Sequence, residues 1–341
     1  MNPALKKTLS ILFIVFSVVV VFCVAFGNRE LHDAWSVILN QDPLWLLGLL
    51  GCWFAYAFFD CLGSWLCLRR QGYSLPIPKV FGITLIGFFY SNITPGASGG
   101  QPMQVNSLYK AGVPVGNGTT AVTVRLLANQ FMVSVLALVL MLLNRPFVYQ
   151  QLEGAVWLVR IGWIINTAVV PLTLLAAFRR SWLQKLVGGL IGLLARIRLV
   201  RNPEELQGRV SGILDTYHEA LSTLLRSPFQ ILTQCLCSAV SLLALTGSII
   251  FVYHALGMSG TPWYRLLTLS VLLFVSASYT PLPGASGAQE GGFLYFFRGI
   301  FTGGTIGIAL LIWRFFTYYL FLFVGLFTML LEKLTRRRHK N

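Results

Sequence analysis

The chain of 341 residues is 56% hydrophobic and only 11% charged, and it carries a formal net charge of +15 at pH 7. A soluble domain of this length needs far more charged surface, so the composition and the mean hydropathy of +0.71 indicate an all-α protein that crosses a membrane several times. Basic residues of such proteins gather at cytoplasmic span ends and meet anionic lipid, so the charge does not indicate a nucleic-acid partner.

Six stretches are long enough to span a bilayer, which takes about 20 apolar residues in a helix. They are residues 8–26, 44–68, 119–143, 161–178, 229–256 and 305–331. The first stretch follows two lysines and lacks a small-residue cleavage site. We therefore expect it to remain as a span rather than to be removed as a signal peptide.

Three shorter apolar pieces surround two glycine-rich elbows in the chain. They are residues 80–92, 266–279 and 293–301. About 14 helical residues rise only about 20 Å, against a hydrocarbon core of about 30 Å. We therefore expect each elbow to be the tip of a re-entrant hairpin, which enters the membrane, turns at depth and leaves on the same side.

The two elbows are nearly the same octapeptide. The sequence PGASGGQP at 95–102 returns as PGASGAQE at 283–290, so six of the eight positions match. This recurrence predicts a duplicated unit, with a first repeat at 44–143 and a second at 229–331. Transporters build substrate sites from such repeated, broken helices.

The distribution of basic residues gives each span a direction. Most basic clusters fall on the cytoplasmic side when both termini are cytoplasmic, as the positive-inside rule requires. The first hairpin then opens toward the cytoplasm and the second toward the exterior, so the repeats are inverted. Residues 179–227 form a cytoplasmic connector, predicted as an amphipathic helix that starts near Asn202 and Pro203. We expect one integral domain, 1–341, in the cell membrane.

Each elbow carries a Ser-x-x-Gln pattern with the spacing of a capping box, at Ser98 and at Ser286. We expect the serine to cap the outgoing half-helix, whose free N–H groups and dipole suit a phosphate. Capping alone, which any backbone in lipid requires, is the simpler interpretation. The substrate contacts expected at the elbows are Gly96, Ser98, Gly99, Gln101, Gly284, Ser286, Gly287, Gln289 and Glu290.

Two arginines and two acids lie in or beside apolar segments. An ionised group at mid-membrane costs about 2.5–3.5 kcal/mol on insertion scales, so Arg125 and Arg314 should face the interior. They either hold a substrate phosphate or pair with Asp60 and Glu290. These acids could instead hold a substrate ammonium or carry a coupling proton. The sequence contains no catalytic triad and no nucleotide-binding loop, and its six cysteines lack the spacing of metal ligands. We therefore expect no cofactor, no metal and no enzyme activity.

At these residues the chain resembles the transmembrane-domain family of the lysylphosphatidylglycerol synthetases, the membrane half of the multiple peptide resistance factor. The family pattern Pro-x-Pro-Gly-Gly-x-Gly-x-x-Glu stands here at 281–290 as PLPGASGAQE. An arginine followed by an aromatic-rich run and a glycine stands at 314–325. The resemblance covers essentially the whole chain.

The first elbow departs from the family. Many members carry Gly-Glu-x-x-Arg where this chain has Gly100, Gln101 and Gln104. Acids that commonly flank the first arginine of the family are replaced here by Val124 and Asn129. These missing charges leave open which substrate of the family applies.

The resemblance implies a flippase that moves an aminoacylated phospholipid, such as lysyl-phosphatidylglycerol, from the inner to the outer leaflet, and a link to cationic-peptide resistance. The soluble transferase domain of the family would follow the last span, and this sequence ends at Asn341, so we expect no lysyl transfer. Two alternatives stay open, a secondary transporter of a small anionic or organic solute and a membrane-embedded lipid transferase. A homo-oligomer and a separate lipid synthase stay open as partners.

Overall fold

A computed structural model describes residues 43–178 and 227–338, apart from 279 and 303, together with the single positions 189, 218 and 222. The expected span at 8–26 and almost all of the connector at 179–227 lie outside the described residues. Within those residues the chain is helical and has no strand, and five helices are long and apolar enough to cross a membrane. The prediction of an all-α, multi-pass membrane protein is confirmed.

The first half contains one helical hairpin between two long helices. Its elements are α3 (Leu44–Arg70), α4 (Ile77–Ile93), the hairpin tip η1 (Pro95–Ala97), α5 (Gly100–Lys110) and α6 (Val115–Leu143). A short segment of α7 (Arg145–Leu152) and η2 (Glu153–Ala155) then leads into α8 (Val156–Phe178). Proline helps to fix the helix starts, because Pro78 lies in the first turn of α4, where an N–H would have no partner within the helix.

The second half repeats this order of elements. They are α11 (Pro228–Ala255), α12 (Trp263–Ala277), the hairpin tip η3 (Pro283–Ala285), α13 (Ala288–Phe296), α14 (Ile306–Arg314), a π-helical turn η4 (Phe315–Tyr319) and α15 (Leu320–Arg338). The elements α14, η4 and α15 form one continuous last span. Its π-helical turn has no counterpart within α6.

Two helices start five residues earlier than the sequence-based expectation. Helix α8 starts at Val156 rather than at 161, and Arg160 is accommodated because its guanidinium lies over the ring of Tyr149, 5.8 Å from the centroid. The helix after the second elbow covers 288–296 rather than 293–301. Its first turn is stabilised by Glu290, and acidic side chains are favoured at that position.

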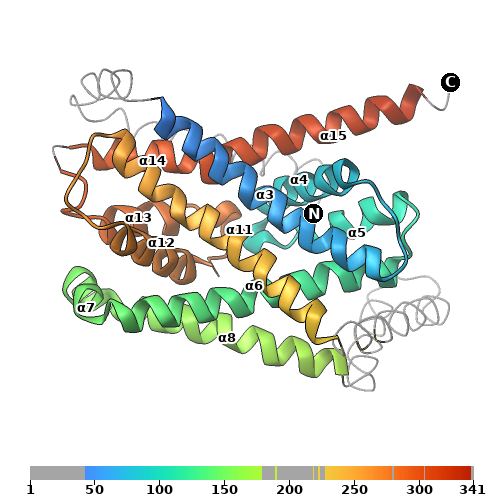
Figure 1. Cartoon of the computed structure of the whole chain (residues 1–341), viewed down its shortest axis with the longest axis horizontal. Helices are drawn as coiled ribbons and strands as arrows, with labels where there is room; N and C mark the ends of the chain where they lie inside the picture. Colours follow the sequence, from blue (N-terminus) through green and yellow to red (C-terminus); the bar gives the residue numbers. More distant parts are fainter. Residues whose placement is uncertain are drawn as a thin grey trace.

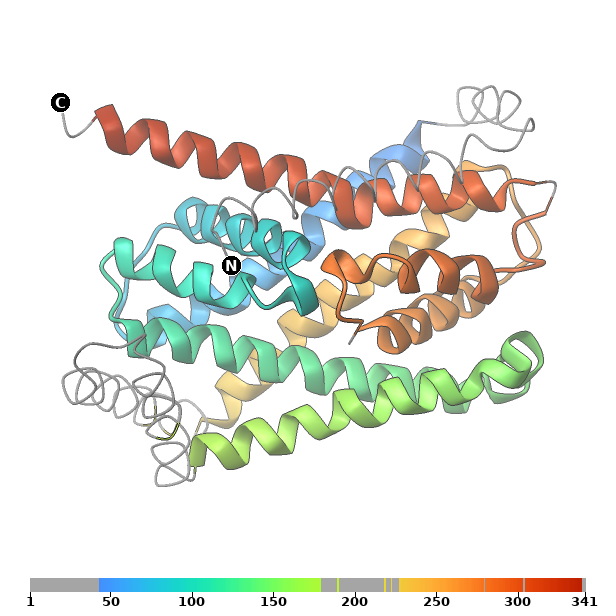
Figure 2. The ribbon, with the colours of Figure 1, turned by 180° about the vertical axis from the view of Figure 1, so that it is seen from behind.

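The tips of the two hairpins meet near the middle of the molecule. Figure 2 shows the α4–α5 and α12–α13 hairpins approaching each other end to end, and η1 contacts η3. Helix α15 packs along α4, and α6 packs against α12, so each hairpin lies against the last span of the other half. The approach of α15 to α4 is close at Gly325, where an added Cβ would lie 2.6 Å from the carbonyl oxygen of Leu85.

Helices α3 and α11 join the two halves as an antiparallel pair (Figure 1). At one end of the pair, the ring of Trp45 stacks on His254 with centroids 4.7 Å apart. At the other end, Arg70 donates a hydrogen bond to Ser227 at 3.1 Å. The two halves therefore share a long, continuous interface.

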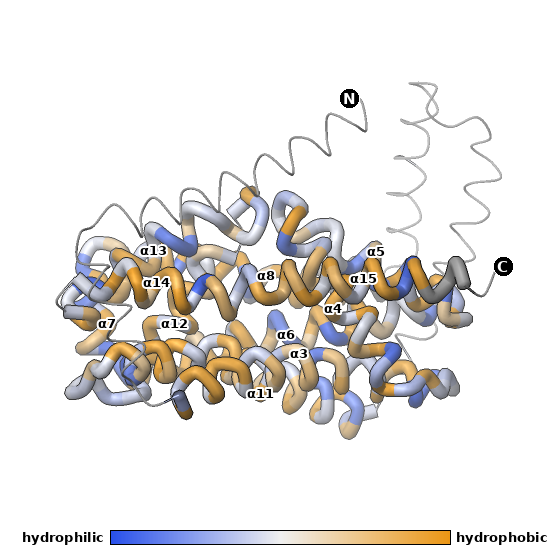
Figure 3. Tube along the Cα trace, turned by 90° about the horizontal axis from the view of Figure 1, so that it is seen from above, coloured by the Kyte–Doolittle hydropathy of each residue, from blue (hydrophilic) through white to orange (hydrophobic). Residues whose placement is uncertain are grey.

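Each hairpin is packed in a hydrophobic core of its own. The core around the first hairpin includes Cys61, Val80, Leu108, Ala121 and Val124. The larger core around the second hairpin includes Leu152, Val159, Leu272, Phe293 and Trp313. Figure 3 shows long hydrophobic stretches along α11, α14 and α15, with many hydrophilic residues toward the two ends of the molecule. Broken helices are tolerated at membrane depth only when they are covered by protein in this way.

Candidate functional site

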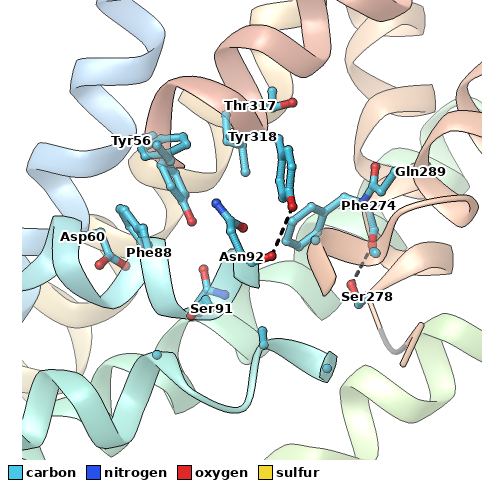
Figure 4. Close-up of a pocket in the computed structure, with 18 of the residues that line it drawn as sticks. Tyr56, Asp60, Phe88, Ser91, Asn92, Phe274, Ser278, Gln289, Thr317 and Tyr318 are labelled. Atoms are coloured by element: carbon cyan, nitrogen blue, oxygen red, sulfur yellow. Dashed lines mark hydrogen bonds between the residues drawn. The ribbon is translucent and has the colours of Figure 1, made fainter. Parts of the chain in front are cut away.

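A cavity of about 450 Å³ lies where the two hairpin tips meet. Its walls come from both halves of the chain. Figure 4 shows Tyr56, Asp60 and Phe88 on one side and Phe274 and Gln289 on the other. The cavity therefore lies where the duplicated elbows predicted a polar chamber.

The two tips turn with the same backbone geometry. Gly96 and Ala97 have φ values of 58° and 55°, and Gly284 and Ala285 have values of 59° and 51°. A left-handed alanine costs about 1–2 kcal/mol, so both tips hold a strained residue at the same position. Such strain is concentrated at functional sites. The tips diverge at the next residue, where ψ is −20° at Ser98 and 144° at Ser286.

The prediction that the elbow serines cap the outgoing helices is wrong. The hydroxyl of Ser98 donates to the carbonyl of Pro95 at 3.0 Å, and that of Ser286 donates to the carbonyl of Pro283 at 2.9 Å. A serine can bond to a backbone carbonyl three residues earlier, and this local option competes with capping. The serines therefore close the turns rather than starting the helices.

Other groups satisfy the first N–H groups after each turn. At the first tip, the N–H of Gly99 donates to the hydroxyl oxygen of Thr94 at 2.8 Å. At the second tip, the N–H of Gly287 donates to Oε2 of Glu290 at 2.6 Å. The second contact gives Glu290 a structural role in the tip itself.

Arg314 connects the last span to the second tip. Its side chain is 4% exposed, and its Nη2 lies 2.5 Å from Oε1 of Glu290. Nε donates to the same oxygen at 2.7 Å, and Nη2 donates to the carbonyl of Gly284 at 3.1 Å. One carboxylate thus binds the arginine through Oε1 and the turn through Oε2.

Arg125 occupies a similar position in the first half. It forms an ion pair with Asp60 of α3, and its Nη2 donates to Oε1 of Gln104 at 2.9 Å. Its buried Nε has no hydrogen-bond partner in the part of the chain that the structure describes. Of the partners expected for the two arginines, both acids are in place, and each arginine also contacts the outgoing arm of its own hairpin.

Tyr318 bridges the two tips. Its hydroxyl donates to the carbonyl of Asn92, at the end of α4, at 3.2 Å (Figure 4). Its ring lies against the second tip, because a Cβ added to Gly284 would be 2.1 Å from Cε2 of the ring. The residue belongs to the π-helical turn, a deviation that is frequent at functional sites.

The expected site residues divide into two groups. Those that line the cavity are Asp60, Gly96, Gln101, Arg125, Gly284, Gln289 and Arg314. Those that do not line it are Ser98, Gly99, Ser286, Gly287 and Glu290. Glu290 nevertheless lies directly against the cavity-lining Arg314.

Sequence reasoning missed other polar residues of the cavity wall. They include Ser91, Asn92, Gln104, Asn129, Ser270 and Tyr318. Asn129 and Ser270 could have been found, because each is a polar residue within an apolar stretch, and such a side chain needs a partner or a cavity. No comparable signal exists for Tyr318, because it lies in a run of aromatic residues.

A bundle of apolar helices with a cavity between two broken hairpins, lined in part by polar and charged side chains, defines a polytopic membrane protein with an internal site. The chain belongs to the family of the lysylphosphatidylglycerol synthase TM region, which it matches over residues 8–325. It is also 25% identical over 320 residues to the UPF0104 membrane protein of Archaeoglobus fulgidus, and the match covers 90% of this chain and 92% of that protein. The resemblance found in the sequence is confirmed, and it links this membrane domain to lipid.

Proposed function

We propose that the protein is a lipid flippase that moves an aminoacylated phospholipid, or a similar anionic amphiphile, between the leaflets of the cell membrane. The observation that carries the proposal is the polar cavity between the two tips, with Arg125 and Arg314 in its wall. The headgroup enters this cavity while the acyl chains stay in lipid. The arginines take turns in binding the phosphate as the two halves rock between inward and outward openings.

A groove beside the cavity supports lateral access for the acyl chains. This groove of about 220 Å³ lies between α6 and α8 and is lined mainly by apolar residues, among them Phe131, Leu138 and Trp163. The same two helices contribute Leu126 and Val169 to the central cavity. The groove favours an amphiphile over the alternative of a small soluble solute, which has no apolar tail to accommodate.

The charges at one end of the molecule support an inverted arrangement of the repeats at 44–143 and 229–331. Lys79 pairs with Glu332 at 3.3 Å, so the end of α15 lies beside the base of the first hairpin. Arg69 and Arg70, at the end of α3, and Lys110, at the end of α5, are also basic. By the positive-inside rule this end is cytoplasmic, and the second hairpin enters from the exterior.

Cysteine labelling tests this orientation. In a variant without the native cysteines, we expect Lys110→Cys to react with a membrane-impermeant maleimide only from the cytoplasm. Ser259→Cys, between α11 and α12, should react only from the exterior. Both positions are exposed, so accessibility depends on the side of the membrane. Labelling of both cysteines from one compartment would contradict the inverted repeat.

A reconstituted leaflet assay tests the function itself. Purified protein in liposomes should move labelled aminoacyl-phosphatidylglycerol between leaflets faster than empty liposomes do, and a proton gradient imposed in parallel would show whether transfer is coupled. Uptake of a small anion without lipid transfer would support the secondary transporter. Formation of a new lipid from added donors would support the transferase.

A further inference from the structure

The charged groups at the cavity cancel one another. Among the described residues that line it, the acidic and basic ones are Asp60, Arg125 and Arg314, and Glu290 completes the set through its contact with Arg314. Two cations face two anions, and all four are paired. The rest of the described polar wall is uncharged and consists of amides and hydroxyls, such as those of Ser91, Asn92, Gln101, Asn129 and Gln289.

This pairing restricts which headgroups the cavity can bind. A phosphate that takes Arg125 from Asp60 leaves the carboxylate buried without a partner, which is strongly unfavourable. A headgroup that also carries an ammonium group avoids this loss, because the ammonium replaces the arginine as the partner of the carboxylate. The ion pair between Arg125 and Asp60 is replaced by two ion pairs with the headgroup, and the total charge of the cavity stays at zero.

Aromatic rings next to Asp60 suit an ammonium group. Tyr56, Phe88 and Phe321 line the cavity together, with ring centroids 5.0 to 5.3 Å apart. Figure 4 shows Tyr56 and Phe88 beside Asp60. The faces of aromatic rings attract cations, and the carboxylate adds the opposite charge.

Two buried atoms of the cavity wall have no hydrogen-bond partner among the described residues. They are Nε of Arg125, which is a donor, and Oε1 of Gln289, which is an acceptor. Gln289 is only 9% exposed, and a buried acceptor without a partner is costly. A free donor fits a phosphate oxygen, and a free acceptor fits an ammonium hydrogen.

We propose that the cavity selects zwitterionic phospholipids, whose headgroups carry one phosphate and one ammonium group and have no net charge. The inference rests on the proposed flippase function and narrows its substrate class. Phosphatidylglycerol esterified with an amino acid that has a single amine belongs to this class, and so does an ethanolamine phospholipid. Phosphatidylglycerol, with one negative charge, and its lysyl ester, with one net positive charge, do not belong to it.

Competition among headgroups tests the selectivity. Protein in nanodiscs is loaded with a fluorescent ethanolamine phospholipid, and unlabelled lipids with the same acyl chains compete for it. We expect the single-amine ester to compete about tenfold better than phosphatidylglycerol or its lysyl ester, since an unbalanced charge in the cavity weakens binding. Equal or better competition by either charged lipid would overturn the proposal.

A charge-changing variant gives an independent test. Gln101→Glu adds one negative charge to the cavity wall, in the first turn of α5, where an acid is favoured. We expect the preference to shift by about tenfold toward the lysyl ester, whose extra positive charge restores neutrality. Gln150→Glu, the same change at an exposed position of α7, should leave the preference unaltered. An unchanged preference in Gln101→Glu would contradict the charge argument.

The leaflet assay separates this inference from the flippase itself. Selective binding of zwitterionic lipid without any transfer between leaflets would refute the flippase and leave the selectivity standing. Transfer that favours a charged headgroup would refute the selectivity and leave the flippase standing.

Discussion

Replacing Arg314 with alanine is expected to abolish lipid transfer and to lower the free energy of unfolding by about 3–5 kcal/mol, because Glu290 is left without its partner in a largely buried site. The side chain of Glu290 is 14% exposed, and its second oxygen still accepts the N–H of Gly287. The free energy is measured by chemical unfolding in detergent micelles, and transfer is measured in liposomes. Transfer at the wild-type rate in this variant would remove Arg314 from the mechanism.

The double variant Arg314→Ala/Glu290→Ala separates stability from transport. With both charges removed, no uncompensated ion remains, and we expect most of the lost stability to return. Lipid transfer should stay absent, because the arginine that binds the phosphate is still missing. If transfer returns together with stability, the ion pair has only a structural role.

Gly284→Ala is expected to destabilise the protein far more than Gly96→Ala, although the two glycines occupy equivalent positions. Both have φ near +60°, so alanine carries the same backbone cost of about 1–2 kcal/mol at either position. At Gly284 the new Cβ would also lie 2.1 Å from the ring of Tyr318, whereas at Gly96 no atom lies within 4 Å. Overpacking of this kind costs about 1–3 kcal/mol more, and the displaced ring would lose its hydrogen bond to Asn92.

Thermal unfolding of Gly284→Ala and Gly96→Ala measures the difference in stability caused by the clash with Tyr318, because the cost of placing alanine at positive φ is the same in both variants. Removing the ring in Gly284→Ala/Tyr318→Ala should relieve the clash, so Gly284→Ala should cost less in the Tyr318→Ala background than in the wild type. Equal losses of stability in Gly284→Ala and Gly96→Ala would show that the tip adjusts without disturbing Tyr318.

The sequence predicted a break in the helices at each elbow, and it could do so because the signal is local. Short apolar pieces on either side of proline and glycine cannot form a full span, and the structure has helices of 17 and 15 residues leading into the two tips. The serine-capping prediction was wrong for a related reason. A local pattern identifies a polar side chain near a helix start, but it cannot show which of several nearby backbone groups that side chain will bind.

The sequence identified Asp60 as one of two candidate partners for Arg125, but it could not show that these two residues form the pair. The two residues lie on different helices, and their contact depends on how α3, α5 and α6 pack. Gln104 completes the contact because Gly87 leaves room for it on α4, where a Cβ would lie 2.2 Å from Nε2 of Gln104. The fit of a side chain on one helix against a glycine on another leaves no periodic pattern in the sequence. It can be seen only in the three-dimensional structure.

The π-helical turn allows the last span to contact both the second tip and α4, which lie in different directions around the helix axis. A π-helical turn holds more residues than an α-helical one, so it rotates the side chains beyond it by about 100° relative to an uninterrupted α-helix. Before the turn, Arg314 is directed toward the second tip, and after it Gly325 is directed toward α4. A regular helix could satisfy only one of these contacts at a time. The extra residue thus rotates the second part of the last span about its axis, so that the span contacts both hairpins.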